Sequence, residues 1–199
     1  MADGTRPQHS GAAITILKTS PRQAGGIAVT SSAFGADGVI PDRYSAYHDN
    51  VSPPLSWTPV EGAGAWALIV EDPDAPRELP FVHWLLWNIP GESTAIAEGV
   101  PQDAESIASE YGVQGRNDGG DMGWMGPKPP PGHGVHRYYF QLFALDGPLD
   151  LGPETDLNTL TSTIKGRVLA QGQLVGTYER ADDSPGEPAA TGSESDSGN

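Results

Sequence analysis

The sequence predicts a mainly β protein, an antiparallel β-sandwich with one or two peripheral helices. Long runs of aliphatic and aromatic residues are bounded by glycine, proline or aspartate, as strands usually are. One stretch late in the chain has the apolar spacing of a helix. The 26 glycines and 19 prolines among 199 residues provide the turns that many short elements need. This length is typical of one domain of ordinary size.

The strand candidates begin with two short segments, residues 13–17 and 26–30. Three longer segments are apolar at both odd and even positions, which predicts strands that are covered on both faces of a sheet. One more strand is expected near the end of the folded region. The three longer segments and this last strand are residues 65–71, 81–89, 137–145 and 171–178.

The main helix candidate lies between the last two strand candidates. Four apolar residues at spacings of three, four and four fall on one helical face. These residues are Leu157, Leu160, Ile164 and Val168. Asp156 is a suitable N-cap for this helix, because its carboxylate can accept from the free backbone N–H groups of the first turn. A shorter helix is predicted at residues 103–110.

The charge balance is strongly acidic, with 26 Asp and Glu against 11 Lys and Arg and a net charge of −15. Such a field repels nucleic acid and anionic membrane surfaces, so neither is an expected partner. Only three of the bases are lysines. An acid-rich, lysine-poor chain is typical of proteins in high intracellular salt, and we therefore predict a halophilic protein. The alternative is an acidic mesophilic protein.

Several classes of protein are excluded by what the chain lacks. It has no cysteine, so disulfides, thiolate metal sites and thiol catalysis are excluded. The longest apolar run, residues 65–70, is too short to cross a bilayer, so no membrane insertion is expected. The first residues lack the pattern of a secretory signal. We expect a cytoplasmic protein with a flexible N-terminus (1–12), a folded domain (13–180) and a disordered acidic tail (181–199).

The first candidate site residues are Asp72 and Asp74, which follow a predicted strand and alternate with prolines. Because proline ends a strand, both carboxylates are expected at the end of a sheet, although taken alone they are better explained by a capped, solvated turn. His83 lies in the most aromatic strand candidate and by a period of two shares a face with Phe81, Leu85 and Trp87. A packed histidine that bonds to a carbonyl group is the simpler interpretation of His83.

A second group of candidates lies in the glycine- and proline-rich loop at residues 123–138. Glycine allows the backbone to approach an anion closely, so this loop can present N–H groups to a phosphate, or it can be a rigid connector. His136 and Tyr138 begin the next strand and point to one face. His48 and His133 are expected to be exposed loop residues. Together the two aspartates, His83, His136 and Tyr138 would form a small polar pocket suited to a phosphate or an ammonium group.

These motifs resemble the phosphatidylethanolamine-binding protein family, and most closely its bacterial and archaeal Raf-kinase-inhibitor-like branch. The resemblance covers residues 28–180 in order. It rests on DPDAP (72–76), HW (83–84) and the loop that leads into HRY (136–138), with further agreement in VSPPLSW (51–57), GRNDGG (115–120) and LVGTY (174–178). The loop before His136 is about two residues longer than is usual in the family, and residues 132–134 are the surplus.

The resemblance implies an antiparallel β fold with an anion pocket at one end, which accepts phosphate and phosphorylated headgroups. It also implies a homodimer and no cofactor. Carried over by position, the ligand-binding residues would be Asp72, Asp74, His83, Gly126, Pro129, His136 and Tyr138.

Three functions are compatible with these residues. The first is a binding protein for a small anionic or phosphorylated ligand, with a regulatory role toward a protein partner. The second is a metal-dependent enzyme in which Asp72, His83 and His136 hold zinc or non-haem iron. The third is a protease or kinase modulator with a vestigial pocket. No known hydrolase elbow, phosphate loop or zinc-protease motif accompanies the candidates, so we expect a binding protein and no enzyme.

Overall fold

The computed structural model describes residues 13–102 and 111–180. The segments predicted as a flexible N-terminus, a short helix at 103–110 and a disordered tail lie outside the described residues. In the part of the chain that is described, no helix is long and apolar enough to cross a membrane.

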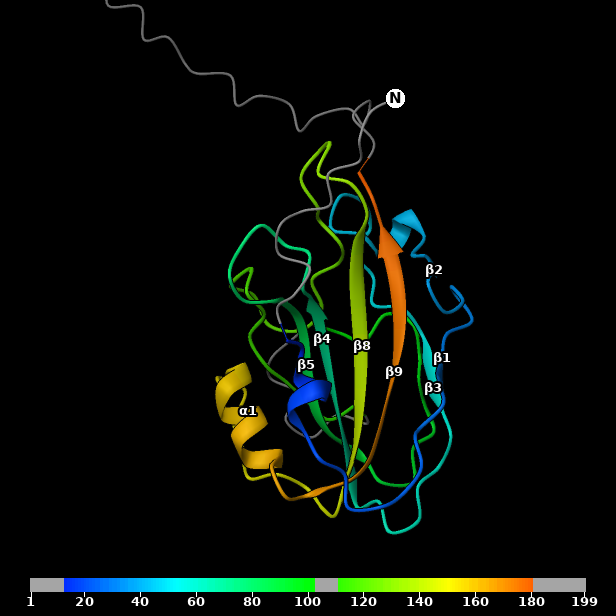
Figure 1. Ribbon diagram of the computed structural model, residues 1–199, viewed down its shortest axis with the longest axis vertical. Helices are drawn as coiled ribbons and strands as arrows, with labels where there is room; N and C mark the ends of the chain where they lie inside the picture. Colours follow the sequence, from blue (N-terminus) through cyan, green and yellow to red (C-terminus); the bar gives the residue numbers. More distant parts are fainter. Residues whose placement is uncertain (1–12, 103–110, 181–199) are drawn as a thin grey trace, which may run out of the picture.

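Strands dominate the described residues and form two sheets (Figure 1). The large sheet has the order β2-β9-β8-β4-β5-β7 and the small sheet the order β1-β3-β6. The pairings are antiparallel except for β2 with β9, which is parallel. The prediction of a mainly β protein is confirmed. The strands are β1 (Val29–Thr30), β2 (Gly38–Val39), β3 (Leu55–Trp57), β4 (Ala65–Asp72), β5 (Phe81–Pro90), β6 (Ala95–Ile96), β7 (Val113–Gln114), β8 (His136–Leu145) and β9 (Val168–Tyr178).

The large sheet is covered on both faces, as its apolar runs predict. On one face Trp66 and Leu68 of β4 belong to a core that includes Trp57 of the small sheet. On the other face Ile69 of β4 packs with Leu160 of the helix. Every residue of β4 is buried, which explains why its apolar residues do not alternate with polar ones.

The helices are η1 (Thr15–Lys18), η2 (Asp42–Tyr44) and α1 (Leu157–Ile164), of which the first two are 3-10 helices. Asp156 caps α1 as predicted, because its Oδ1 accepts from the backbone N–H of Thr159 at 2.7 Å. The predicted helical face extends to Val168, but α1 ends earlier. Lys165 leaves the helical conformation, Gly166 follows with φ +77°, and Val168 begins β9.

The strand predicted at residues 13–17 is wrong, because this segment forms η1 instead. Its backbone groups are satisfied by side chains of the large sheet rather than by a neighbouring strand. The N–H of Thr15 donates to Oε2 of Glu71 at 2.8 Å, and the N–H of Ile16 donates to Oε1 of Gln141 at 2.6 Å. These two buried side chains hold the segment on the face of the sheet that also carries α1.

Candidate functional site

A pocket of about 280 Å³ lies at one end of the strands of the large sheet, where β4 ends and β8 begins. The two strands are antiparallel neighbours, so the last residue of β4 lies close to the first residue of β8. The loop that follows β4 and the loop that precedes β8 complete the walls. Among the predicted site residues, four line this pocket: Asp72, His83, Pro129 and His136.

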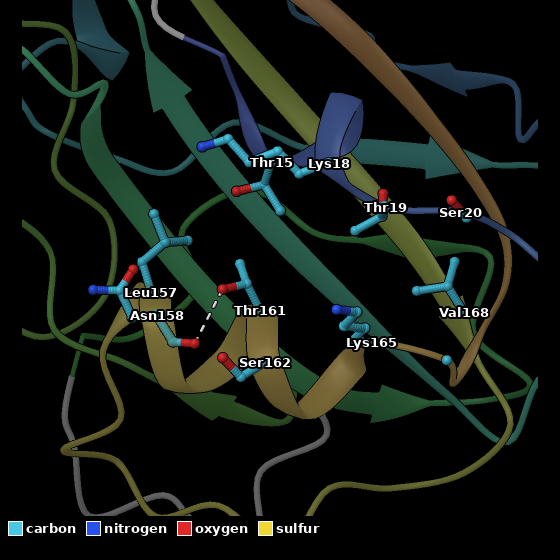
Figure 2. Close-up of a pocket in the computed structure, with 11 residues that line it drawn as sticks. Thr15, Lys18, Thr19, Ser20, Leu157, Asn158, Thr161, Ser162, Lys165 and Val168 are labelled. Atoms are coloured by element: carbon cyan, nitrogen blue, oxygen red, sulfur yellow. Dashed lines mark hydrogen bonds between the residues drawn. The ribbon is translucent and has the colours of Figure 1, made fainter.

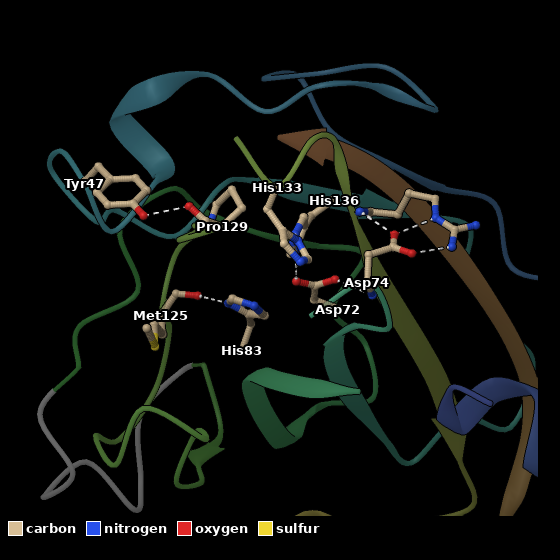
Figure 3. A network of polar contacts seen from close by, with 9 residues as sticks. Tyr47, Asp72, Asp74, His83, Met125, Pro129, His133 and His136 are labelled. Carbon is tan, nitrogen blue, oxygen red and sulfur yellow. Dashed lines mark hydrogen bonds and ion pairs between the residues drawn. The ribbon is translucent and has the colours of Figure 1, made fainter. Parts of the chain in front are cut away.

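The central feature of the pocket is a chain of three hydrogen-bonded side chains (Figure 3). Nδ1 of His136 lies 2.7 Å from Oδ2 of Asp72, and both residues are buried, at 1% and 3% exposure. Because a carboxylate accepts hydrogen bonds, the proton lies on Nδ1 of His136 and its Nε2 is free for another partner. That partner is Nδ1 of His133, at 2.8 Å.

The position of His133 differs from the expectation of an exposed loop residue. It is half-buried and contacts His136 through the hydrogen bond and through ring centroids 5.0 Å apart. The surplus loop residues 132–134 therefore bring a third histidine to the site. With the proton of His136 on Nδ1, its Nε2 accepts from the Nδ1–H of His133.

His83 reaches the same side of the sheet because of a β-bulge. Val70 of β4 pairs with Trp84 and Glu71 pairs with Val82, so His83 lies between two paired positions. The predicted alternation placed His83 on the face of Phe81, Leu85 and Trp87. The centre of the Phe81 ring does lie 4.8 Å from that of the His83 ring, but the prediction is wrong for Leu85 and Trp87. Leu85 and Trp87 pack on the face of α1, whereas the His83 ring contacts Tyr138.

The protonation state of His83 follows from its surroundings. Burial lowers the pKa of His83 below its usual 6.5, although the charge of Asp72 and the hydrogen bond to Met125 oppose this effect. Nδ1 of His83 lies 2.7 Å from the carbonyl oxygen of Met125, and a carbonyl accepts, so Nδ1 carries the proton. In this neutral form Nε2 is an acceptor, and it can bind a donor group of a ligand.

Tyr138 lies beneath the pocket. It is fully buried, its ring meets His83 edge-on at 5.0 Å, and its hydroxyl has no hydrogen-bond partner among the described residues. Burial raises the pKa of Tyr138 well above its usual value, so the hydroxyl stays protonated. Tyr138 is not among the described residues that line the pocket, so its contact with the site is through the ring of His83.

Asp74 does not line the pocket. Its carboxylate accepts from Nε and from an Nη of Arg137 at 2.7 Å each, and from the backbone N–H of Arg137 at 3.0 Å. Burial alone would raise the pKa of Asp74, but the hydrogen bond and the charge of Arg137 outweigh it and lower the pKa. The backbone N–H of Asp74 donates to Oδ1 of Asp72 at 2.8 Å. Asp74 therefore contributes to the site by holding the carboxylate of Asp72 in place.

Gly126 also has a different contact from the one predicted. Its N–H donates to Oδ1 of Asn50 at 2.7 Å, and an added Cβ would collide with the carbonyl oxygen of Tyr44. Glycine is thus required here for close packing of two loops. Prolines at 127 and 129–131 have no N–H, so residues 126–131 do not present the row of backbone donors that the glycine content suggested.

Sequence reasoning missed three residues at the mouth of the pocket: Arg77, Phe81 and Lys128. Lys128 is exposed and forms no ion pair with the described residues, and its Nζ lies 6.0 Å from the ring centre of Tyr47. Arg77 lies over Phe81 and pairs with Asp118 at 2.8 Å. Lys128 lies within the glycine- and proline-rich loop that the sequence predicts as part of the site. Nothing in the local sequence indicates that residues 77 and 81 lie at the same pocket.

The metal-site hypothesis places Asp72, His83 and His136 around one ion. In the structure Asp72 and His136 bond to each other and Nδ1 of His83 bonds to Met125. Within residues 13–102 and 111–180, no three His, Asp or Glu side chains are arranged to hold a metal ion. The arrangement instead offers donors, acceptors and transferable protons around a small cavity.

Comparisons with known proteins identify the family of this chain. The sequence profile of the phosphatidylethanolamine-binding protein family (PEBP) matches residues 30–179. A protein of Methanothermobacter thermautotrophicus named UPF0098 is 46% identical over 149 residues, which are 74% of this chain and 95% of the relative. A Mycobacterium tuberculosis relative named "putative lipoprotein LppC" is 36% identical, over 87% of this chain and 83% of its own.

A solved structure is also similar. The crystal structure of Escherichia coli YbcL, described as a new member of the mammalian PEBP family, superposes with a TM-score of 0.72 at 26% identity. The superposition covers 78% of this chain and 99% of YbcL. The likeness thus extends over nearly all of the described residues.

Proposed function

Because this chain belongs to the phosphatidylethanolamine-binding protein family, we propose that it binds a small phosphate-bearing ligand in the pocket between β4 and β8. The observation that carries the proposal is the hydrogen-bonded chain Asp72–His136–His133, whose members Asp72 and His136 are buried and line the pocket. An oxygen of a phosphate is a strong acceptor, and it favours the protonated forms of both imidazoles.

The rest of the pocket supports the same ligand class. Lys128 adds a cation at the mouth that is not neutralised by any described carboxylate. His83 is neutral and offers an acceptor, which suits an ammonium group or the hydroxyl of a protonated phosphate. A zwitterionic phosphodiester with an amine supplies the anion and the donor together. The volume of about 280 Å³ is suited to a headgroup and not to a whole lipid.

We propose that the protein acts through binding and not through catalysis. No serine or threonine is among the described residues that line the pocket, so a hydroxyl nucleophile beside His136 is not supplied there. A regulatory role, in which ligand and protein partner meet at this pocket, extends the proposal.

The test is a calorimetric titration with glycerophosphoethanolamine, inorganic phosphate and glycerol. We expect the two phosphates to bind and glycerol not to bind. His136→Ala and Lys128→Met are expected to weaken binding, whereas His48→Ala, on the exposed loop beside η2, leaves it unchanged. If neither phosphate binds, or if His136→Ala has no effect, the pocket is vestigial and the proposal is wrong. Stoichiometric bound metal in purified protein would favour the enzyme hypothesis instead.

Two further predictions concern the assembly and the compartment. We propose a homodimer, which sedimentation velocity checks, because a single protomer would sediment as a species of 20.9 kDa. We also propose a cytoplasmic location, which cell fractionation checks. Because one relative is named a putative lipoprotein, the amounts of protein in the soluble and membrane fractions should be compared.

A further inference from the structure

A second and larger cavity lies on the other face of the large sheet, between η1 and α1 (Figure 2). Its volume is about 500 Å³, which is within the range of small-molecule sites. One wall comes from η1 and the residues after it, and the other comes from α1 and the turn that leads into β9. None of its lining residues belongs to the pocket between β4 and β8.

The charge of this cavity is opposite to that of the molecule. The chain has 26 acidic residues and only three lysines, yet two of those lysines, Lys18 and Lys165, line the cavity. No Asp or Glu is among its described lining residues. On a surface where carboxylates outnumber bases, such a region provides a local positive potential.

The two lysines also differ from the arginines in their partners. Six of the seven described arginines form ion pairs with Asp or Glu. Lys18 and Lys165 form no ion pair with any residue in the described part of the chain, although both are exposed and many carboxylates are available. Their ammonium groups are therefore free to bind an external anion.

The rest of the lining matches an organic anion. Hydroxyl groups of Thr15, Ser20 and Ser162 lie along the walls, and they can donate to acidic oxygens. Leu157 and Val168 add an apolar surface that can contact a short hydrocarbon or aromatic part. Side chains of this kind, a few polar groups among apolar ones, fix the orientation of a small ligand.

Both walls are fixed before any ligand binds. The η1 wall is held by the bonds of Thr15 and Ile16 to the sheet and by Thr19, whose hydroxyl donates to Oε1 of Gln171 at 2.5 Å. The α1 wall is held by its buried residues Leu160 and Ile164. A preformed cavity reduces the entropy cost of binding, which favours a real site over a transient gap.

We infer that this cavity binds a small organic anion, with its acidic group, a phosphate monoester or a carboxylate, held by Lys18 and Lys165 and its apolar part against Leu157 and Val168. The inference is independent of the proposed function. It uses different residues on the opposite face of the sheet, so either site can fail without the other.

The test uses protein with ¹³C-labelled lysine, in which the three lysines give three Cε signals. Phenyl phosphate is the probe, with inorganic phosphate, benzoate and phenol in separate arms. We expect the Lys18 and Lys165 signals to shift together and to saturate with phenyl phosphate or benzoate, more weakly with inorganic phosphate and not with phenol. The two organic anions distinguish a phosphate site from a carboxylate site. Binding should weaken as salt rises, because the contacts are ionic and partly exposed.

Matched variants locate the site. Lys18→Met and Lys165→Met are each expected to weaken binding about fivefold to tenfold, as for the loss of one charge-assisted hydrogen bond. Lys128→Met, which removes the lysine of the other pocket, should leave these shifts unchanged. Ser162→Asp should abolish binding by placing a carboxylate in the cavity, whereas Thr159→Asp on the same helix outside it should not.

The inference is overturned if the Lys18 and Lys165 signals stay unchanged, or move without saturation, in every anion arm. It is also overturned if phenol binds as well as phenyl phosphate does, because the site would then be merely apolar. A shift of the Lys128 signal alone would support the pocket between β4 and β8 and reject this cavity.

Discussion

In the pocket between β4 and β8, His83 and His136 differ in the group that accepts the hydrogen bond from Nδ1. Asp72 fixes the proton of His136, and Met125 fixes that of His83. His136 donates to the carboxylate through Nδ1, and His83 is kept neutral by burial. His83 and His136 thus carry different chemistry, which a motif alone does not reveal.

The neutral state of His83 leads to a prediction on stability. Because burial lowers the pKa of His83 in the folded protein, the unfolded chain binds more protons below about pH 6.5. The free energy of unfolding should therefore fall as the pH drops from about 6.5 toward the folded-state pKa, by at most about 1.4 kcal/mol per pH unit. Urea unfolding of wild type and His83→Gln at intervals between about pH 7 and 5 checks this.

The variant should show a shallower slope in that window, whatever its stability at neutral pH. His48→Gln is the control, since His48 is exposed on a loop and should keep the wild-type slope. An unchanged slope in His83→Gln would contradict the assignment of a neutral buried histidine.

His133 leads to a second prediction at this scale. Its Nδ1 donates to Nε2 of His136, so an anion at this point should draw an additional proton into the pair. His133→Ala should weaken binding of glycerophosphoethanolamine near pH 7 about threefold to tenfold and should reduce the number of protons taken up. Calorimetry in buffers of different ionisation enthalpy measures that number. Wild-type affinity and proton uptake in His133→Ala would show that the surplus loop has no part in the site.

At the scale of elements, the local sequence pattern predicts a strand or helix correctly where the whole segment is buried. It fails where the segment is held by side chains that are distant in the sequence. The strands β4, β5 and β8 are predictable because they carry apolar residues at both odd and even positions, and α1 because its apolar spacing and Asp156 agree. Residues 13–17 have the mostly apolar pattern of a short strand. Their actual partners, Glu71 and Gln141, are more than 50 residues away, and local sequence cannot show them.

The same distinction applies to the candidate site. Asp72 and His136 could be predicted because each lies at the end of a recognisable strand, and the structure brings them together. The separation of Asp74 could not be predicted, since it depends on the exposed fork of Arg137 lying beside it. The bulge that turns His83 toward Tyr138 is likewise a property of the pairing of two strands and not of either sequence alone.

The cap of α1 gives a prediction for an element. Asp156→Ala removes the acceptor of the Thr159 N–H and should lower the free energy of unfolding by about 1 kcal/mol. Asp150→Ala, an exposed aspartate before the helix, is the control and should change stability little. Because α1 forms one wall of the cavity that Lys165 lines, Asp156→Ala should also weaken phenyl phosphate binding there. Chemical denaturation and the lysine titration measure the two effects, and a loss equal to that of Asp150→Ala would contradict the role of the cap.

At the scale of the whole molecule, charge is distributed unevenly. The chain has a net charge of −15 and three lysines. Two of them line the cavity between η1 and α1 and the third lines the pocket between β4 and β8, whereas most of the described arginines pair with carboxylates. Several of these ion pairs are partly exposed and contribute little to stability each. Because acidic residues outnumber basic ones, most carboxylates have no basic partner and repel one another. The three lysines form no ion pair in the described part of the chain.

That self-repulsion leads to the prediction on salt. At low ionic strength the Debye length is about 30 Å at 0.01 M, comparable to a small domain, so carboxylates across the surface repel one another. Salt shortens this range to about 3 Å at 1 M and should stabilise the folded state relative to the more expanded unfolded chain. We expect the melting temperature to rise steadily from about 0.01 M to above about 1 M KCl, beyond the point where screening alone would saturate. Differential scanning calorimetry in KCl measures this, and a series at constant pH keeps the histidine protonation from contributing. A rise that stops near about 0.15 M would indicate screening of an ordinary acidic protein, and a flat profile would contradict the halophilic interpretation of the composition.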